Sequence, residues 1–216
     1  MKKLSKDKIL EKNKEYSENF IQPSADLSLP EYMKDIFNNN NVKNFIDLGC
    51  GDGIVISAVK NKYPKIKISG IDISPRRINS LKKRFPRDNF YVKDVCGTKL
   101  KQQYEFVHSS QVIEHVPFDK EMVKEMSRLL TDNGVLFCSS VIKKPWAIYK
   151  YRNNGRFVLG PTHEREYKDK KQFLNLFKKD FKLIKSWQIP VSRDILGFHI
   201  IIPGYFLVFG IWKKRN

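Results

Sequence analysis

The segment from Phe45 to Gly53 places the strongest constraint on this chain, because it reads FIDLGCGDG and has three glycines among its last five residues. Glycine adopts positive φ angles without strain and lets backbone N–H groups approach a ligand closely. The apolar run at 42–48 predicts a short strand before this turn, and residues 53–63 have helical spacing. The glycine spacing differs from the G-x-G-x-x-G pattern of dinucleotide sites, so we expect a smaller ligand.

Apolar and helical segments alternate along the chain up to residue 142. The predicted strands are 42–48, 65–73, 89–95, 104–109 and 134–142, and the predicted helices between them are 53–63, 74–85 and 119–130. Ser74 is placed to cap the helix that Pro75 begins, and Ser28 to cap an earlier helix with Pro30 in its first turn. Because helices separate the strands, the sequence predicts a doubly wound, mostly parallel Rossmann-like α/β sheet.

The polar residues at the predicted strand ends indicate the ligand. Asp72 follows the glycines by about twenty residues at the end of the next strand, where a carboxylate accepts hydrogen bonds from ribose hydroxyls. Asp94 ends the third strand and is placed to meet the exocyclic amine of an adenine that lies against Ile73 and Val95. Asp47 suits a ligand with an ammonium group; the alternative is a structural role, holding the turn through backbone N–H groups. Together these positions favour an adenosine that carries an amino acid.

These residues resemble the class I S-adenosylmethionine-dependent methyltransferases, in particular the ubiquinone-biosynthesis O-methyltransferase type. The resemblance runs in register over residues 42–142. It includes DLGCGDG, GIDIS, KDV and YEFVHSSQVIEHV, and the later segment THEREY (162–167) is similar to a further element of the family. The resemblance implies S-adenosylmethionine as cofactor. The implied contacts, besides Asp47 and the residues at the second and third strand ends, are Gly49, Cys50 and Gly51 around the methionine part, and Ser109 to Gln111 facing the sulfonium.

The histidines have two open interpretations. In the ubiquinone type, a glutamate, two residues and then Glu-His form a set associated with a metal. Here Gln111 takes the first position before Glu114 and His115, and an amide is a weaker ligand for a hard cation than a carboxylate, so we expect no metal. His115 and His163 are then the candidate catalytic residues, as proton acceptors. The alternative is that they orient a helix or the substrate.

We expect a single domain, 1–216, with four parts. These are a helical N-terminal extension (1–40), a cofactor-binding core (42–142), a basic and aromatic insertion on the substrate side (143–167), and a C-terminal helix, predicted at 169–180, with an antiparallel hairpin (168–216).

Residues 195–212 contain no Asp, Glu, Lys or Arg, and this length reaches that of a membrane span. Pro203 and Gly204 predict a turn in the middle, so we expect a hairpin at the sheet edge. A lipid-facing patch that contacts a membrane peripherally is the alternative.

The chain has a formal net charge of +18, with the excess in two segments, 60–101 and 143–193. Such a charge favours phosphates, carboxylates, nucleic acid or an anionic membrane surface; a lysine-rich composition without function is the alternative. The cysteines, Cys50, Cys96 and Cys138, include no C-x-x-C pair, so neither a disulfide framework nor a cysteine-based zinc site is indicated. This favours a cytoplasmic protein, with a location at the membrane periphery as the variant.

The sequence therefore predicts a methyltransferase that acts on a small or lipid-linked, acidic acceptor. The segment 143–167 offers cations and flat apolar faces for such an acceptor, namely Lys143, Lys144, Lys150, Arg152, Arg156 and Arg165 among Trp146, Tyr149, Tyr151 and Phe157. Lysines that only keep the surface soluble are the alternative. An RNA methyltransferase, or a non-catalytic basic protein that binds nucleic acid on the same fold, are the other functions considered; no separate RNA-binding module is recognisable.

Overall fold

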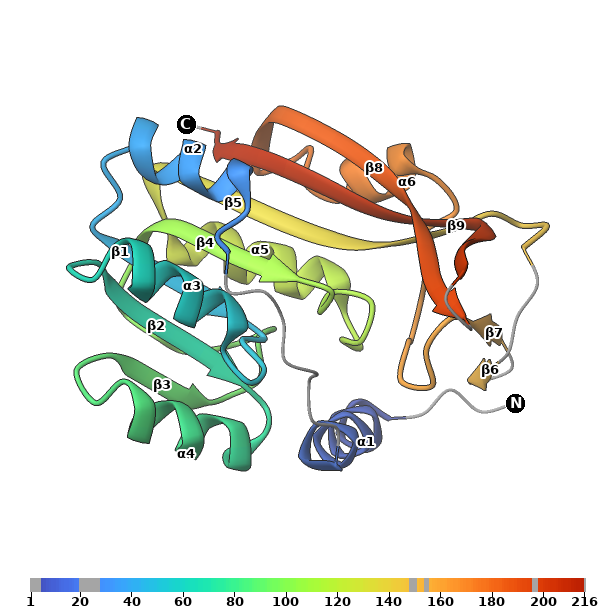
Figure 1. Ribbon diagram of the computed structural model, residues 1–216, viewed down its shortest axis with the longest axis horizontal. Coiled ribbons are helices and arrows are strands. Elements are labelled where there is room, and N and C mark those ends of the chain that lie inside the picture. The colour runs from blue at the N-terminus through green and yellow to red at the C-terminus, as the bar shows by residue number, and fades with distance from the viewer. Residues whose placement is uncertain (1–4, 20–27, 148–150, 154–155, 196–197, 216) are drawn as a thin grey trace.

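The computed structural model describes residues 5–19, 28–147, 151–153, 156–195 and 198–215, without the side chains of 152–156 and 193–199. Seven strands form one sheet in the order β3-β2-β1-β4-β5-β9-β8 (Figure 1). The first five are mutually parallel, and β9 pairs antiparallel with β5 and β8. Their bounds are β1 Asn44–Leu48, β2 Lys67–Asp72, β3 Asn89–Val92, β4 Tyr104–Ser110, β5 Leu130–Lys143, β8 Phe181–Ile195 and β9 Phe198–Lys214. This confirms the predicted fold class.

Helices cover both faces of the sheet because successive strand residues point to opposite faces. Phe45 and Phe106 pack under α2 (Glu31–Asn39), α3 (Ile54–Lys62) and α4 (Pro75–Arg84). Ile46 and Val107, the next residue in each strand, pack under α5 (Asp119–Leu129) and α6 (Lys170–Asn175). Both faces are thus buried, as a parallel sheet requires.

The helix starts agree with the sequence in one case and differ in another. Ser74 caps α4, since its side chain accepts a hydrogen bond from the Arg77 N–H, and Pro75 is the first residue of the helix. Ser28 does not cap α2: the N-cap is Pro30, which has no side-chain cap. The helix predicted at 169–180 ends at Asn175, and turns occupy the next five residues.

The C-terminal hairpin is present, but the predicted turn is wrong. Pro203 and Gly204 lie inside β9. The pairing between β8 and β9 shifts register between Pro190 and Ser192, and Gly204 has φ +80°. Such an irregularity relieves Pro203 of the ladder hydrogen bond that proline cannot donate. No described helix has the length and apolarity needed to cross a membrane.

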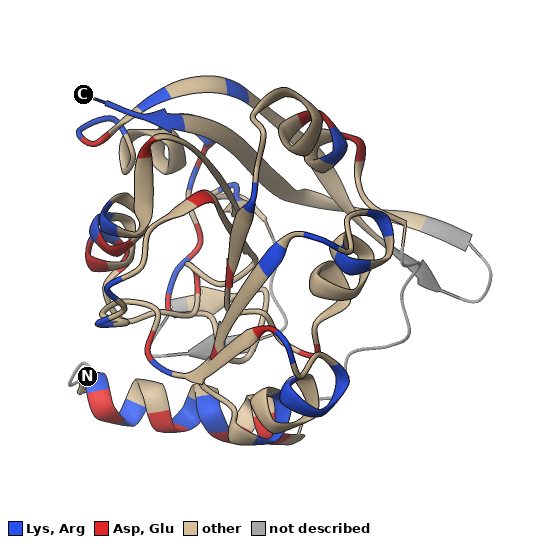
Figure 2. Cartoon of the chain, turned by 90° about the vertical axis from the view of Figure 1, so that its left-hand side faces the viewer, with Lys and Arg blue, Asp and Glu red and all other residues tan. Residues whose placement is uncertain are grey.

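Two smaller pieces lie beside the ends of the central strands. Strands β6 (Tyr151–Asn153) and β7 (Arg156–Val158) form a separate antiparallel pair within the predicted insertion. Helix α1 (Lys6–Asn19) lies below the sheet in Figure 1, near α4. Acidic and basic residues alternate along α1, and further basic residues are spread over several elements of the face seen in Figure 2.

Candidate functional site

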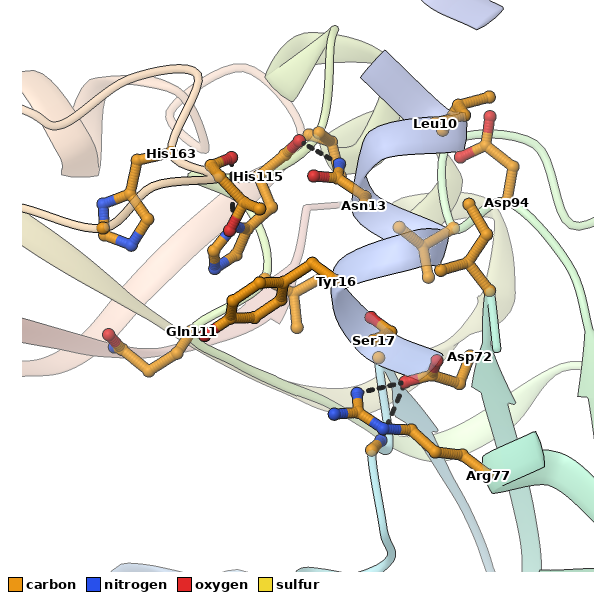
Figure 3. Close-up of a pocket in the computed structure, with 18 of the residues that line it drawn as sticks. Leu10, Asn13, Tyr16, Ser17, Asp72, Arg77, Asp94, Gln111, His115 and His163 are labelled. Carbon is orange, nitrogen blue, oxygen red and sulfur yellow. Dashed lines mark hydrogen bonds and ion pairs between the residues drawn. The ribbon is translucent and has the colours of Figure 1, made fainter. Parts of the chain in front are cut away.

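A cavity of about 320 Å³ lies at the carboxyl ends of the parallel strands (Figure 3). Its floor comes from the glycine turn after β1, the ends of β2 and β3, and the segment after β4. Residues 160–163 close one side, and α1 covers it with Leu10, Asn13, Tyr16 and Ser17. In an open parallel sheet, ligands bind at this edge, where the strand order reverses.

Asp72 links two walls of the cavity. Its Oδ2 accepts a hydrogen bond of 2.9 Å from the Gly51 N–H, and its Oδ1 accepts one of 2.9 Å from the Ser74 N–H. Arg77 Nη1 lies 3.7 Å from Oδ2, and Arg77 Nε lies 3.7 Å from Asp52 Oδ1. Burial raises the pKa of Asp72, and the Ser74 amide and the Arg77 guanidinium oppose the rise. A carboxylate has about four acceptor positions, so Asp72 retains capacity for ligand hydroxyls.

The glycine turn has the backbone that its sequence predicts. Gly49 and Gly51 have φ +78° and +54°, in the left-handed region that favours glycine. The amides of Gly49 and Cys50 both donate to Ile71 O, at 2.7 and 2.9 Å, which fixes the turn against β2. A Cβ at Gly49 would lie 2.3 Å from Val112 Cγ2, so the turn has no room for a side chain there.

Most residues expected to contact a cofactor line this cavity. Gly49, Gly51, Asp72, Ile73, Asp94, Val95 and Gln111 belong to its walls. Asp94 also accepts a hydrogen bond from the Cys96 N–H at 2.9 Å, and its Oδ2 lies 3.3 Å from Lys6 Nζ of α1.

Three expected contacts lie outside the cavity wall. Asp47 is buried in the core, where its Oδ1 lies 2.8 Å from His108 Nδ1. It therefore neither lines the cavity nor holds the glycine turn through backbone N–H groups, the two roles that the sequence left open. Cys50 is buried in the apolar core. The Ser109 hydroxyl donates to Leu48 O, and the cavity wall has Ser110 instead, because neighbouring strand residues face opposite sides.

Gln111 lies at the cavity in an uncommon backbone conformation. Its φ is +58°, which few residues other than glycine adopt and which is a form of strain found at functional sites. Its side-chain Nε2 donates to Ser139 Oγ at 3.2 Å. The amide is therefore held against β5.

The structure brings the two candidate catalytic histidines together. The rings of His115 and His163 meet edge to face with centroids 4.7 Å apart, and both line the cavity. His115 Nδ1 lies 3.0 Å from Thr162 Oγ1, and His163 Nδ1 lies 2.8 Å from Glu166 Oε1. Burial lowers the pKa of His115 to about 3, so this imidazole is neutral at physiological pH.

Glu114 lies beside this pair, fully buried, and burial raises its pKa. One ligand atom each from Glu114, His115 and His163 lie within 4.8 Å of one another, close enough to hold a metal ion. The expectation of no metal considered only Gln111, Glu114 and His115. The structure adds His163, which the sequence motif does not contain.

Sequence reasoning missed the cavity residues of α1. Ile9, which is buried, and Leu10, Asn13, Tyr16 and Ser17 recur at intervals of three to four residues, so they share one face of the helix. That spacing was the available signal, although charged residues surround it. Arg77 and Thr162 were also missed as cavity residues.

The chain matches a model of a known protein family. The family described as "Methyltransferase domain" matches residues 23–187, which is more than half of the chain.

Two curated relatives are similar in sequence. A malonyl-[acyl-carrier protein] O-methyltransferase of Ilyobacter polytropus is 26% identical over 181 residues, covering 80% of this chain and 66% of that protein. A trans-aconitate 2-methyltransferase of Escherichia fergusonii is 28% identical over 96 residues, covering 44% of this chain and 38% of that protein. The chain thus spans less than two thirds of the length of these relatives.

Among solved structures, the N-methyltransferase NodS of Bradyrhizobium japonicum in complex with S-adenosylhomocysteine superposes with a TM-score of 0.62. It is 11% identical, and the match covers 97% of this chain and 98% of that one. This likeness shows that the two chains share a fold.

Proposed function

The chain belongs to the methyltransferase-domain family, and we propose that it transfers the methyl group of S-adenosylmethionine to a carboxylate oxygen of a small or lipid-linked acidic acceptor. Family membership confirms the class I methyltransferase type expected from the sequence. It does not single out the ubiquinone-biosynthesis type. The observation that carries the proposal is the cavity at the strand ends, with Asp72 and the glycine turn in its wall.

S-adenosylmethionine, when bound, supplies a methyl group on a positively charged sulfur. The residues of the chain would hold and orient it. Asp72 is placed to accept hydrogen bonds from ribose hydroxyls, while Ile73 and Val95 offer apolar contacts to a flat ring beside Asp94. Gly49 and Gly51 allow the backbone of the turn to approach the ligand.

An acidic acceptor is supported from two sides. The cavity wall includes two basic side chains, Lys93 and Arg77, of which Arg77 also pairs with Asp72. The two curated relatives carry names of enzymes that methylate acids, a malonyl group on a carrier protein and trans-aconitate. Basic side chains at a cavity attract a carboxylate and lower the cost of removing it from water.

A carboxylate acceptor also fits the protonation state of the site. Its oxygen is already anionic at neutral pH, so no base has to remove a proton before the methyl group is transferred. His115 is neutral and directed to Thr162 through Nδ1. The protein then mainly aligns the two reactants and excludes water, which is where much of the rate gain of such displacements arises.

The test uses the purified chain, S-adenosylmethionine with a labelled methyl group, and a cell extract separated into lipid, small-molecule and RNA fractions. We expect label in the small-molecule or lipid fraction, released as methanol by mild alkali, because esters hydrolyse where ethers and N-methyl groups do not. Label confined to RNA, or label stable to alkali, would contradict the carboxylate acceptor.

A further inference from the structure

Glu114, His115 and His163 form a cluster with the composition of a transition-metal site. Their ligand atoms all lie within 4.8 Å of one another. Glu114 and His115 come from the segment after β4, and His163 from the loop before α6. The amides of Glu164 and Arg165 donate to Glu114 O at 2.9 and 3.3 Å, so the backbone itself holds the two segments together.

One carboxylate oxygen of Glu114 is buried without a hydrogen bond. Its Oε2 accepts from the Ser140 hydroxyl at 2.9 Å, whereas Oε1 is buried and has no hydrogen-bond partner among the described residues. A buried carboxylate oxygen without a partner is costly. A bound cation would satisfy it.

The Nδ1 atom of each histidine already has a hydrogen-bond partner that fixes the ring. Glu166, whose side chain is 3% exposed, lies 2.8 Å from His163 Nδ1, and its Oε1 also accepts from the Leu159 N–H at 2.7 Å. Thr162 contacts His115 Nδ1. In metal sites, a carboxylate on the outer nitrogen of a ligating histidine fixes the ring and increases the basicity of the other nitrogen.

The donor set indicates which metal would bind. Mg²⁺ and Ca²⁺ prefer sites built from oxygen ligands, while two imidazoles with one carboxylate suit Zn²⁺ and related transition metals. The side-chain amide of Gln111 donates to Ser139 Oγ instead. In the ubiquinone-type set, a glutamate at the position of Gln111 is the third residue. In this chain, His163 supplies the third donor.

We propose that Glu114, His115 and His163 bind a divalent transition metal of the Zn²⁺ type at the wall of the cavity, with Glu166 as the partner that orients His163. This revises the expectation drawn from Gln111 alone. The inference does not depend on the acceptor, because metal binding can be measured without turnover.

The experiment strips the full chain with a chelator and dialyses it against Zn²⁺ together with excess Mg²⁺. Bound metal is then measured by elemental analysis. We expect one Zn²⁺ per chain in the presence of excess Mg²⁺, and none after His163→Ala. Glu166→Gln should weaken Zn²⁺ binding by about 10–100-fold, whereas Glu164→Gln, the same change two residues away and outside the cluster, should not.

Two further measurements separate loss of the site from loss of the fold and from binding to cysteine. Circular dichroism of each variant should match that of the unmodified chain. Co²⁺ in place of Zn²⁺ should give visible d–d absorption without the near-ultraviolet band of cobalt–thiolate bonds. Zn²⁺ retained in full by a folded His163→Ala variant, no Zn²⁺ bound by the unmodified chain, or a thiolate band would each overturn the proposal.

Discussion

Asp72 accepts a hydrogen bond from the backbone amide of Gly51 at 2.9 Å, which joins the end of β2 to the glycine turn after β1. The carboxylate that would hold the ribose and the turn that would face the methionine part are therefore positioned by one contact. The second oxygen of Asp72 fixes the start of α4 through the Ser74 amide. Substitution of Asp72 should consequently change both the affinity for the cofactor and the backbone of the glycine turn and the start of α4.

Asp72→Ala should weaken binding of S-adenosylhomocysteine at least tenfold, since hydrogen bonds to a charged group contribute about 1.5–3 kcal/mol each. Titration calorimetry measures the change. Asp132→Ala is the matched control and should bind normally, because Asp132 lies near the start of β5, outside the cavity wall, with an exposed side chain paired to Lys214. Equal affinity in Asp72→Ala would remove Asp72 from the site.

As the pH is lowered, cofactor affinity should begin to fall at a higher pH than it would if Asp72 had the pKa of an ordinary aspartate. Burial raises the pKa of Asp72, against the opposing effects of the Gly51 and Ser74 amides and Arg77, and Asp47 adds to the rise. Only the ionised carboxylate accepts hydrogen bonds at both oxygens, so affinity is present above the raised pKa and is lost as the pH falls through it. Binding measured between pH 8 and the acid limit of the fold checks this, and Asp72→Asn should flatten the profile.

The same shift has the opposite sign for stability. A carboxyl whose pKa is raised by folding binds its proton more tightly in the native state, so it contributes most to the free energy of unfolding at low pH and loses that contribution as the pH rises. The difference in stability between the unmodified chain and Asp72→Asn should therefore change with pH in this direction. A constant difference would contradict the raised pKa.

Gly49→Ala should destabilise the chain, because Gly49 has φ +78° and its new Cβ would lie 2.3 Å from Val112 Cγ2. A loss of about 1–3 kcal/mol is expected for a non-glycine residue in such a conformation, and each kcal/mol lowers Tm by roughly 2–4 °C in a chain of this size. Gly97→Ala is the control, since nothing lies within 4 Å of its added Cβ. Similar Tm values for both variants would show that the turn is not tightly constrained.

Asn13→Ala should speed the release of cofactor. Asn13 Nδ2 donates to His115 O at 2.8 Å, and Ile9 is the one buried residue of α1 within Lys6–Asn19, so polar contacts contribute much of the attachment of this helix over the cavity. Dissociation rates from stopped-flow fluorescence should rise several-fold. Asn19→Ala removes only a bond to Glu15 O within the same helix and should leave the rate unchanged.

The sheet and the cofactor side of the cavity could be predicted because they follow from local patterns. Strand ends in a parallel sheet meet at one edge, so Asp72 and Asp94 had to lie near the glycine turn. The prediction failed at Ser109, because a shift of one residue along a strand changes the face of the sheet, and Ser110 lines the cavity instead. It also failed at Asp47, because this carboxylate pairs with His108 rather than with a ligand.

Contacts between distant segments were beyond the sequence. Asn13 and His115 are 102 residues apart. The spacing along α1 can mark one face of the helix, but it does not show that this face covers the cavity. Arg165 was expected among the cations of segment 143–167 that contact the acceptor. Its guanidinium instead donates to the carbonyls of Ile113, Val116 and Pro117. A sequence does not show whether a cation faces a ligand or the backbone. Tyr149 and Lys150 lie outside the described residues, as do the side chains of Arg152 and Arg156. Their expected contact with the acceptor therefore stays a prediction.

The most direct test of the account is calorimetric titration of the unmodified chain with S-adenosylmethionine, S-adenosylhomocysteine and NADH under the same conditions. The cavity and the glycine spacing predict binding of one S-adenosyl ligand per chain, with S-adenosylmethionine and its demethylated product both preferred to NADH. Preferential binding of NADH, or no binding of either S-adenosyl ligand, would contradict the assignment of the cavity as a methyl-donor site.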